Sequence, residues 1–353
     1  MIEWGGMKIG TLVAAATLAT LMGSAPADSM AAVDAAVAAA PVLEDRYPRA
    51  KVSFGSDVES YPDLIYTTPL GFRPLRLDLY RQLAPAGPRP LVIYIHGGGW
   101  RSGHTRHSGA FANWPDVLAS LARKGYVVAS VEYRLSSEAK FPAAIHDVKT
   151  AIKWLRSKAS EFAIDPGQVV IWGGSAGGQL AALAATSCGV DALAPERAAA
   201  ANQAAAELAV QSDCVQGLVA WYGVFDFGSI PELSPSGAGR SDSAASPVGK
   251  YLGCAPAQCA SKVTLASPIT HLDAKDPPTL LIHGEMDKVV PVSQSRAFDA
   301  ALRVKGIASE LLIIPAADHS FVGNSPDATR QASLLALSKT FEFIDALSGG
   351  KPQ

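Results

Sequence analysis

The chain has 353 residues, of which 48% are hydrophobic and 18% are charged, and this apolar content is too high for a disordered protein. Its formal net charge of -2 excludes a general affinity for nucleic acid or for an anionic membrane surface. The sequence contains no basic block, no heptad pattern and no internal repeat, so we expect an ordinary globular protein.

The first 27 residues have the three-part layout of a secretory signal peptide. A lysine follows Met7, an apolar stretch ends at Met22, and Ala-Pro-Ala at 25–27 forms a small-residue cleavage pattern. This stretch is too short to span a bilayer, so no stable membrane insertion is expected after cleavage. An uncleaved membrane anchor and an alanine-rich tail are the alternatives. We expect a secreted or periplasmic protein in which residues 28–50 form a disordered lead-in.

Seven short apolar runs are predicted to be strands: 75–80, 91–96, 126–133, 168–173, 217–223, 279–284 and 310–315. Most are apolar throughout, which is typical of strands that are covered on both faces of a parallel sheet. Helical spacing predicts helices between them: 109–124, 141–160, one starting at 176, 293–305 and 328–347. The alternation predicts an α/β fold, with a mostly parallel doubly wound sheet and helices on both faces, as one domain over residues 51–348.

One region, residues 226–268, interrupts this alternation and is rich in Ser, Gly and Pro. It follows a predicted strand that ends near Gly223, and ligands of α/β folds bind beyond the carboxyl ends of the strands. Two interpretations are therefore open: an insertion that caps the substrate site, or a surface loop without a function.

The four cysteines are relevant to whether the protein lies in an oxidising compartment outside the cytoplasm. An even number of cysteines in an exported chain suggests disulfides, and four cysteines allow three connectivities. Proximity in the sequence favours Cys188 with Cys214 and Cys254 with Cys259. Loop-closure entropy gives the first pair about 3 kcal/mol of stabilisation and the second pair less. Four free thiols are the alternative, and no Cys/His spacing resembles a zinc site.

The segment His-Gly-Gly-Gly-Trp at 96–100 directly follows a predicted strand. Acyl transfer needs hydrogen-bond donors for the oxyanion that forms on the substrate carbonyl, and the HGGG pattern supplies backbone amides for it. Gly98 and Gly99 are our candidate donors, with Ala176 as the third. The alternative is a simple turn at the end of a strand.

Residues 173–177, Gly-Gly-Ser-Ala-Gly, match the pattern G-x-S-x-G and place Ser175 between a predicted strand and a helix. Side chains at 173 and 177 would clash with the neighbouring strand and helix, which explains the glycines. A phosphate-binding loop is also rich in glycine, but it needs Lys-Ser or Lys-Thr where this chain has Gln-Leu. We therefore interpret Ser175 as a nucleophile.

An acid and a histidine follow in the chain order that this motif requires. Asp287 comes just after the predicted strand 279–284, and His319 comes just after 310–315. Both are expected at the strand ends where Ser175 also lies. His319 would accept the serine proton as a general base, and Asp287 would orient the imidazole and stabilise its charge.

Other acids and histidines compete for these roles. Glu285 lies earlier in the same turn, and Asp318 is too close in sequence to His319 to hold its ring. His96 and His283 precede glycines at strand ends, which indicates local hydrogen bonding. The remaining histidines are expected to be structural or at the surface, and those at 104 and 107 lack a third ligand at metal-binding spacing: His104, His107, His146 and His271.

Aromatic residues are candidates for the wall of a substrate pocket. Trp100 and Tyr222 are our candidate substrate-binding residues, and Phe111 and Trp114 are further possibilities. Aromatic residues belong to the hydrophobic core more often than to a pocket, and this remains the alternative for all four.

Long segments of the chain resemble the bacterial α/β-hydrolase esterases, from about Leu75 to Phe343. The resemblance rests on the motifs above and on VEYRL, FPAAIHDVK and PAADHSF. It is closest to the carboxylesterases related to hormone-sensitive lipase, including the bifunctional acetylxylan and feruloyl esterase (BD-FAE-like) branch. The resemblance implies a Ser-His-Asp triad, an HGGG oxyanion loop and no cofactor.

Two positions refine this resemblance. Relatives of hormone-sensitive lipase often have an acidic residue before the nucleophile, whereas this chain has Gly174, which is more similar to the acetylxylan and feruloyl branch. Asp147 matches a family position, and we interpret it as a structural residue that supports the nucleophile region.

Together these features predict an exported serine carboxylesterase that acts on short-chain or aryl esters through an acyl-enzyme. Acetyl or feruloyl esters of plant polysaccharides are possible substrates, either as small molecules or linked to the polymer. One alternative is a peptidase or amidase of the same fold, although such relatives usually carry a large extra domain. The other is a binding protein on an inactive hydrolase scaffold, against which the presence of Ser175, Asp287 and His319 argues.

Overall fold

The computed structural model describes residues 49–196, 203–230 and 243–349. The predicted signal peptide, nearly all of the predicted lead-in and residues 231–242 of the predicted insertion therefore lie outside the described residues. Within the described part, no helix is both long enough and apolar enough to cross a membrane.

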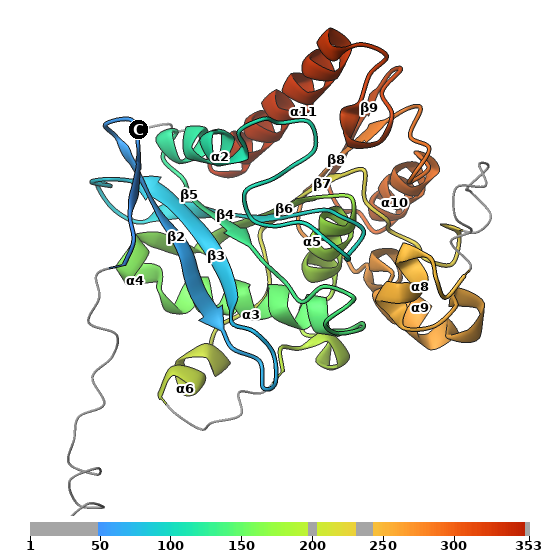
Figure 1. Cartoon of the computed structure of the whole chain (residues 1–353), viewed down its shortest axis with the longest axis horizontal. Coiled ribbons are helices and arrows are strands. Elements are labelled where there is room, and N and C mark those ends of the chain that lie inside the picture. The colour runs from blue at the N-terminus through green and yellow to red at the C-terminus, as the bar shows by residue number, and fades with distance from the viewer. Residues whose placement is uncertain (1–48, 197–202, 231–242, 350–353) are drawn as a thin grey trace, which may run out of the picture. The chain divides into compact units, whose positions relative to one another are not determined.

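A nine-stranded sheet runs through the described residues (Figure 1). The order is β1-β2-β3-β5-β4-β6-β7-β8-β9; pairing is antiparallel from β1 to β5 and parallel from β5 to β9. The bounds of the strands are β1 Val52–Phe54, β2 Val58–Thr67, β3 Leu75–Gln82, β4 Arg89–Ile95, β5 Val127–Val131, β6 Ile164–Gly174, β7 Gly217–Trp221, β8 Thr279–Gly284 and β9 Ser309–Ile314.

All seven predicted strands are present, and the prediction of a mostly parallel sheet is confirmed. The sequence analysis missed β1 and β2, which extend the sheet on its antiparallel side. β1 has only three residues. β2 contains Pro62, and its pairing with β3 shifts register between Tyr61 and Leu64. This irregularity interrupts the alternation of polar and apolar residues by which a strand is recognised.

Helices cover both faces of the sheet (Figure 1). The helices α2 and α11 pack on one face, and α3, α5 and α10 pack on the other. Alternate residues of β4 enter the two hydrophobic cores: Leu91 and Ile93 on one face, Val92 and Tyr94 on the other. The bounds of the helices are α2 Trp114–Arg123, α3 Ala143–Ser157, α4 Ala159–Phe162, α5 Ala176–Thr186, α6 Gln203–Ala209, α8 Pro247–Leu252, α9 Ala260–Ala266, α10 Ser293–Val304 and α11 Pro326–Leu347.

The predicted helices differ from the observed ones mainly at their ends. The helix predicted at 109–124 begins only at Trp114, because the Asn113 side chain caps it by accepting from the Asp116 amide and a proline follows at the start. The helix predicted at 141–160 is divided into α3 and α4. Helix ends depend on such local contacts more than on the spacing of apolar residues.

The described part of the predicted insertion forms two short helices, α8 and α9, and packs into the core. Tyr251 and Leu252 of α8 are buried, and Tyr251 stacks on Trp100 with ring centroids 4.5 Å apart. The predicted disulfide between Cys254 and Cys259 closes the segment between these helices, with Cα atoms 6.3 Å apart. This part of the insertion is therefore more than a surface loop.

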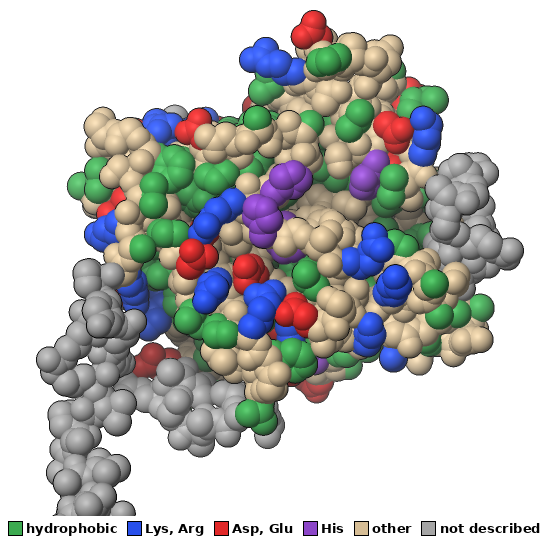
Figure 2. Space-filling view, in the orientation of Figure 1, with side chains coloured by type: hydrophobic (Ala, Val, Ile, Leu, Met, Phe, Trp, Pro, Cys, Tyr) green, Lys and Arg blue, Asp and Glu red, His purple; other side chains and the backbone are tan. Residues whose placement is uncertain are grey.

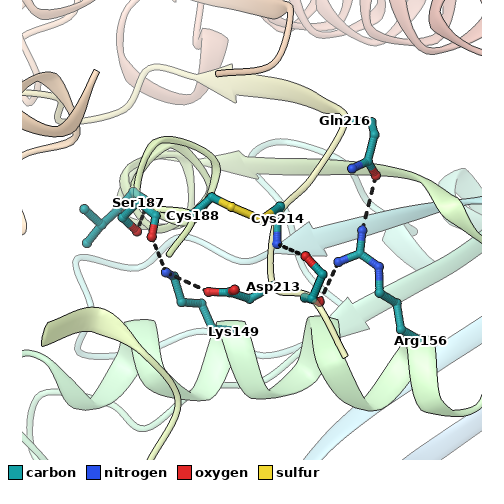
Figure 3. Close-up of a disulfide and its surroundings, with 9 residues drawn as sticks. Lys149, Arg156, Ser187, Cys188, Asp213, Cys214 and Gln216 are labelled. Atoms are coloured by element: carbon teal, nitrogen blue, oxygen red, sulfur yellow. Dashed lines mark hydrogen bonds and ion pairs between the residues drawn. A yellow bond between two sulfur atoms is a disulfide. The ribbon is translucent and has the colours of Figure 1, made fainter. Parts of the chain in front are cut away.

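The second predicted disulfide links Cys188, just after α5, to Cys214, just before β7, with Cα atoms 5.0 Å apart. Beside it lies Lys149 of α3, whose side chain is fully buried (Figure 3). Its ammonium group donates to the Ser187 carbonyl at 2.6 Å and pairs with Asp213 at 2.8 Å. Burial lowers the pKa of Lys149, and Asp213 opposes this shift. The disulfide thus links these two segments to each other, and Lys149 fastens the same two segments to α3.

Asp147 of α3 forms a buried ion pair with Arg134, which follows β5. Their side chains are each 3% exposed, and the guanidinium Nη2 lies 2.7 Å from Asp147 Oδ1. The Arg134 backbone amide also donates to this carboxylate at 2.8 Å. The contact fits a structural role for Asp147, but it joins α3 to the end of β5 and makes no hydrogen bond to the turn around Ser175.

Asp147→Asn should lower the free energy of unfolding by about 3 kcal/mol, because Arg134 would lose its buried charged partner and keep only the exposed Glu196, at 3.0 Å. Asp57→Asn is the matched control. Asp57 pairs with Arg123 at the surface, where both side chains are more than 40% exposed, and its loss should cost less than about 1 kcal/mol. Urea denaturation of both variants measures the difference, and equal losses would contradict the prediction.

Candidate active site

Ser175 occupies a sharp turn between β6 and α5. Its backbone has φ 56° and ψ −121°, a conformation that non-glycine residues rarely adopt and that is typical of a nucleophile elbow. The turn is held from β7 by a hydrogen bond from the Ser175 amide to the Trp221 carbonyl, at 2.9 Å. A Cβ on Gly177 would lie 2.1 Å from the carbonyl oxygen of Ile95, so α5 approaches β4 as closely as only glycine permits.

The structure brings Ser175 together with the predicted histidine and acid. The Ser175 hydroxyl lies 3.0 Å from His319 Nε2, and His319 Nδ1 lies 2.7 Å from Asp287 Oδ2. Because a carboxylate only accepts, Nδ1 carries the proton and Nε2 is free to accept from the serine. The three residues follow the carboxyl ends of β6, β8 and β9. This arrangement has the geometry of a nucleophile, a base and an orienting acid.

The Asp287 carboxylate is buried but accepts hydrogen bonds from several neighbouring groups. Its Oδ1 accepts from the Val289 and Val290 amides at 2.8 Å each, and its Oδ2 is 3.2 Å from His283 Nε2. Burial acts to raise the pKa of Asp287, but hydrogen bonds from His283 and His319 outweigh it and hold the pKa below its ordinary value. Asp287 is therefore ionised at neutral pH.

The competing acids have other positions. Asp318 Oδ1 accepts from the backbone amides of His319 and Lys288, at 2.7 and 3.0 Å, and does not hold the imidazole. Glu285 is exposed to solvent. Of the three acids considered, the structure places only Asp287 against the His319 ring.

The predicted oxyanion donors lie around the same cavity as Ser175. Gly98, Gly99 and Ala176 all line it. Gly98 has φ +108°, and its carbonyl accepts from the Arg101 and Ser102 amides at 3.1 and 3.2 Å, so the loop forms a tight turn after β4. This turn places the predicted donors on the same cavity as Ser175.

The cavity has a volume of about 700 Å³. Part of its wall is apolar, and Ile230, Pro247 and Val248 of the predicted insertion contribute to it together with Val224 and Val290. The described part of the insertion therefore faces the cavity, as the capping interpretation expects.

Only some of the aromatic residues predicted to form the pocket wall line the cavity. Trp100 and Tyr222 line the cavity, but each is only 3% exposed. Trp100 donates its indole N–H to Gln179 at 3.0 Å, and Tyr222 packs edge-on against His319. Phe111 and Trp114 do not line the cavity; their rings pack together in the core, 5.2 Å apart.

His96 and His283 form local hydrogen bonds, as their positions predict. His96 donates to the Gly97 carbonyl at 2.8 Å and stacks on Tyr133. His283 is bonded to Ser295 at 2.7 Å and to the Val290 carbonyl at 2.8 Å.

The sequence analysis missed the contact of His283 with Asp287. The only available signal was that Asp287 follows His283 by four residues in the turn after β8. This spacing alone does not show that the turn brings Asp287 back against the His283 ring.

His104 and His107 line the cavity, with ring centroids 6.1 Å apart. Across the described ranges, no group of three or more His, Cys, Asp or Glu side chains has the arrangement of a metal site.

The sequence pattern of the BD-FAE family matches residues 77–302. Among curated proteins, the chain is 34% identical over 263 residues to the esterase LipQ and 35% identical over 249 residues to the esterase LipC, both of Mycobacterium tuberculosis. These alignments cover 71% and 69% of this chain, but only 55% and 56% of the relatives, so the chain spans about half of their length.

Solved structures show the same architecture. A truncated carbohydrate esterase from gut microbiota superposes with a TM-score of 0.67 at 26% identity, covering 82% of this chain and 96% of that one. A thermophilic esterase from Thermogutta terrifontis superposes with a TM-score of 0.61 at 25% identity, covering 81% and 91%. The sheet described above is therefore that of an α/β-hydrolase.

The buried His96 makes stability depend on pH. Burial lowers its pKa from 6.5 to about 4. Between these values the unfolded chain binds a proton that the folded protein does not, so the free energy of unfolding should fall as the pH decreases. The loss should reach about 3 kcal/mol at pH 4. Urea denaturation from pH 7.5 to 4 measures it, and His96→Asn should show a flatter dependence. An unchanged dependence in the variant would rule out His96 as the cause.

Proposed function

The chain belongs to the BD-FAE family of α/β-hydrolase carboxylesterases, and from this premise we propose that the protein is a serine hydrolase that cleaves carboxylic esters through an acyl-enzyme. The observation that carries the proposal is the continuous hydrogen-bond chain from Ser175 through His319 to Asp287, at 3.0 and 2.7 Å. It lies at the wall of a cavity that is large enough for an aryl acid.

Acylation begins when the Ser175 hydroxyl attacks the ester carbonyl carbon and passes its proton to His319 Nε2. The carbonyl oxygen becomes an oxyanion, for which the backbone amides of Gly98, Gly99 and Ala176 are the proposed donors. The intermediate then collapses: the bond to the alcohol breaks, and His319 returns its proton to the departing oxygen.

Deacylation repeats these steps with water. His319 takes a proton from the water as its oxygen attacks the acyl carbon, and the Ser175 oxygen leaves with the proton that His319 returns. The products are a carboxylic acid and free enzyme. Throughout, the ionised Asp287 keeps the His319 proton on Nδ1 and stabilises the imidazolium that forms in each half-reaction.

The substrate is proposed to be an ester of a short acyl chain or an aryl acid. Valine and isoleucine side chains of the cavity wall suit such groups. Because one structural neighbour is a carbohydrate esterase, acetyl or feruloyl groups on plant polysaccharide are the proposed natural esters. Export is proposed from the signal-like first 27 residues, and two disulfides support it because disulfides persist in oxidising compartments.

Ser175→Ala and His319→Ala should each lower kcat/KM for p-nitrophenyl acetate by at least about 10³-fold while the fold survives. Asp287→Asn should lower it by about 10⁴-fold, because the imidazole would lose the acceptor that fixes its tautomer. Circular dichroism and thermal denaturation check that each variant is folded.

Glu285→Gln is the matched control for the acid, since it removes an exposed carboxylate from the same turn. It should change kcat/KM less than twofold. Retained activity in Ser175→Ala or His319→Ala would show that the assignment is wrong, and a large loss in Glu285→Gln would place the acid elsewhere.

A substrate panel separates the proposed specificities. Rates on p-nitrophenyl acetate, p-nitrophenyl octanoate, methyl ferulate and acetylated xylan, measured on residues 28–353, should be highest for the acetyl or feruloyl esters and absent in Ser175→Ala. Hydrolysis of p-nitroanilide amides without ester hydrolysis would favour the peptidase alternative. A folded protein that hydrolyses neither would favour the binding protein.

A further inference from the structure

The wall of the active-site cavity has an unusual charge balance. The chain has 32 acidic and 30 basic residues, yet no Asp or Glu is found among the described residues that line the cavity. Asp287 is shielded from it behind His319. The lining does include two permanent cations, Arg101 and Lys288. Among the described residues, a ligand in this cavity therefore meets hydrogen-bond donors and positive charge without a competing carboxylate.

The two cations differ in what they contact. Lys288 is 71% exposed and already forms an ion pair with Asp318 at 3.2 Å. Arg101 is exposed and forms neither an ion pair nor a side-chain hydrogen bond with any residue that the structure describes. Arg101 is thus the cation at this site whose donors remain available to a ligand.

Arg101 lies close to the reacting centre. It follows the proposed oxyanion loop directly, and its amide is bonded to the Gly98 carbonyl at 3.1 Å. Its Nε lies 3.9 Å from the point where a Cβ on Gly99 would stand, so the guanidinium folds back over that loop. A group bound by Arg101 would therefore lie a short distance from the carbonyl that Ser175 attacks.

Two exposed histidines extend this polar part of the wall. The Arg106 amide donates to His104 Nδ1 at 3.1 Å, which leaves Nε2 of a neutral His104 as a donor. His107 lies beside it on the same cavity. Figure 2 shows histidine side chains at the surface on one face of the molecule. His104 and His107 line the same cavity as Arg101 and add donors to its wall.

We propose that this cavity selects esters that carry a carboxylate near the scissile bond, and that Arg101 binds this carboxylate. The inference rests on the proposed esterase function and narrows its substrate class. A guanidinium presents a planar pair of donors that matches a carboxylate, and such charge-assisted pairs are stronger than neutral hydrogen bonds. The carboxylate has two possible sources: a uronic acid on the alcohol side, or a dicarboxylic acid on the acyl side.

Matched pairs of substrates test the proposal and distinguish the sources. On the alcohol side, acetylated methyl glucuronide is compared with acetylated methyl glucoside. On the acyl side, monomethyl succinate is compared with methyl butyrate. The ratio of kcat/KM, acid over neutral, is measured for each pair in the unaltered protein and in Arg101→Gln.

For one of the two pairs, kcat/KM for the acid should exceed kcat/KM for the neutral ester about tenfold in the unaltered protein. In Arg101→Gln the two values should be nearly equal. Arg101→Lys should keep part of the preference, because the charge remains while the planar fork is lost. The preference should also weaken as salt is raised from 20 to 500 mM, since the pair is near the surface.

Arg76→Gln is the matched control. Arg76 is also exposed and has no side-chain partner in the described part of the chain, but it lies on β3 and does not line the cavity, so its removal should leave the ratio unchanged. Ratios near one for both pairs in the unaltered protein would overturn the proposal, as would a preference that survives Arg101→Gln. The proposal would also be overturned if the protein cleaves p-nitrophenyl acetate but hydrolyses none of the four test esters.

The test of Arg101 and the test of the proposed esterase function can fail independently of each other. Cleavage of p-nitrophenyl acetate that survives Ser175→Ala would contradict the serine mechanism, whatever the ratios are. Cleavage that depends on Ser175 but shows no preference for the acids would leave the esterase intact and remove only the role of Arg101.

Discussion

The close packing of α5 against the strands on either side of β6 is the constraint on which the site depends. The Ser175 amide is bonded to the Trp221 carbonyl of β7, and Gly177 lies against the Ile95 carbonyl at the end of β4. Any side chain at 177 would push the helix away from β4. Because β4 leads directly into the proposed oxyanion loop, the same contact sets the distance between Ser175 and its proposed donors.

Charge is distributed unevenly around this turn. The ionised Asp287 lies behind His319, buried and held by two backbone amides and His283, so its charge acts on the imidazole and is screened from the cavity. In front of His319, the described lining has Arg101 and Lys288 but no carboxylate. The negative charge therefore acts on the His319 imidazole, while the positive charge of the described lining faces the cavity.

The sequence alone predicted the parallel strands, the disulfide pairs and the three residues of the hydrogen-bond chain, because apolar runs and turn motifs are local signals. β2 was missed because Pro62 and a register shift break its pattern. The contact of His283 with Asp287 was missed for a different reason. It depends on how the two ends of one turn fold onto each other, which no spacing of residues reveals.

The stacking of Tyr251 on Trp100 has a consequence for protein engineering. Tyr251 belongs to α8 of the insertion, and Trp100 belongs to the proposed oxyanion loop. The Trp100 indole donates to Gln179 of α5, the helix that follows Ser175. One aromatic ring thus joins the part that shapes the cavity to the parts proposed to perform the chemistry. Grafting an insertion from a relative to obtain a new specificity would therefore also shift the oxyanion loop, unless the graft supplies an equivalent ring beneath Trp100.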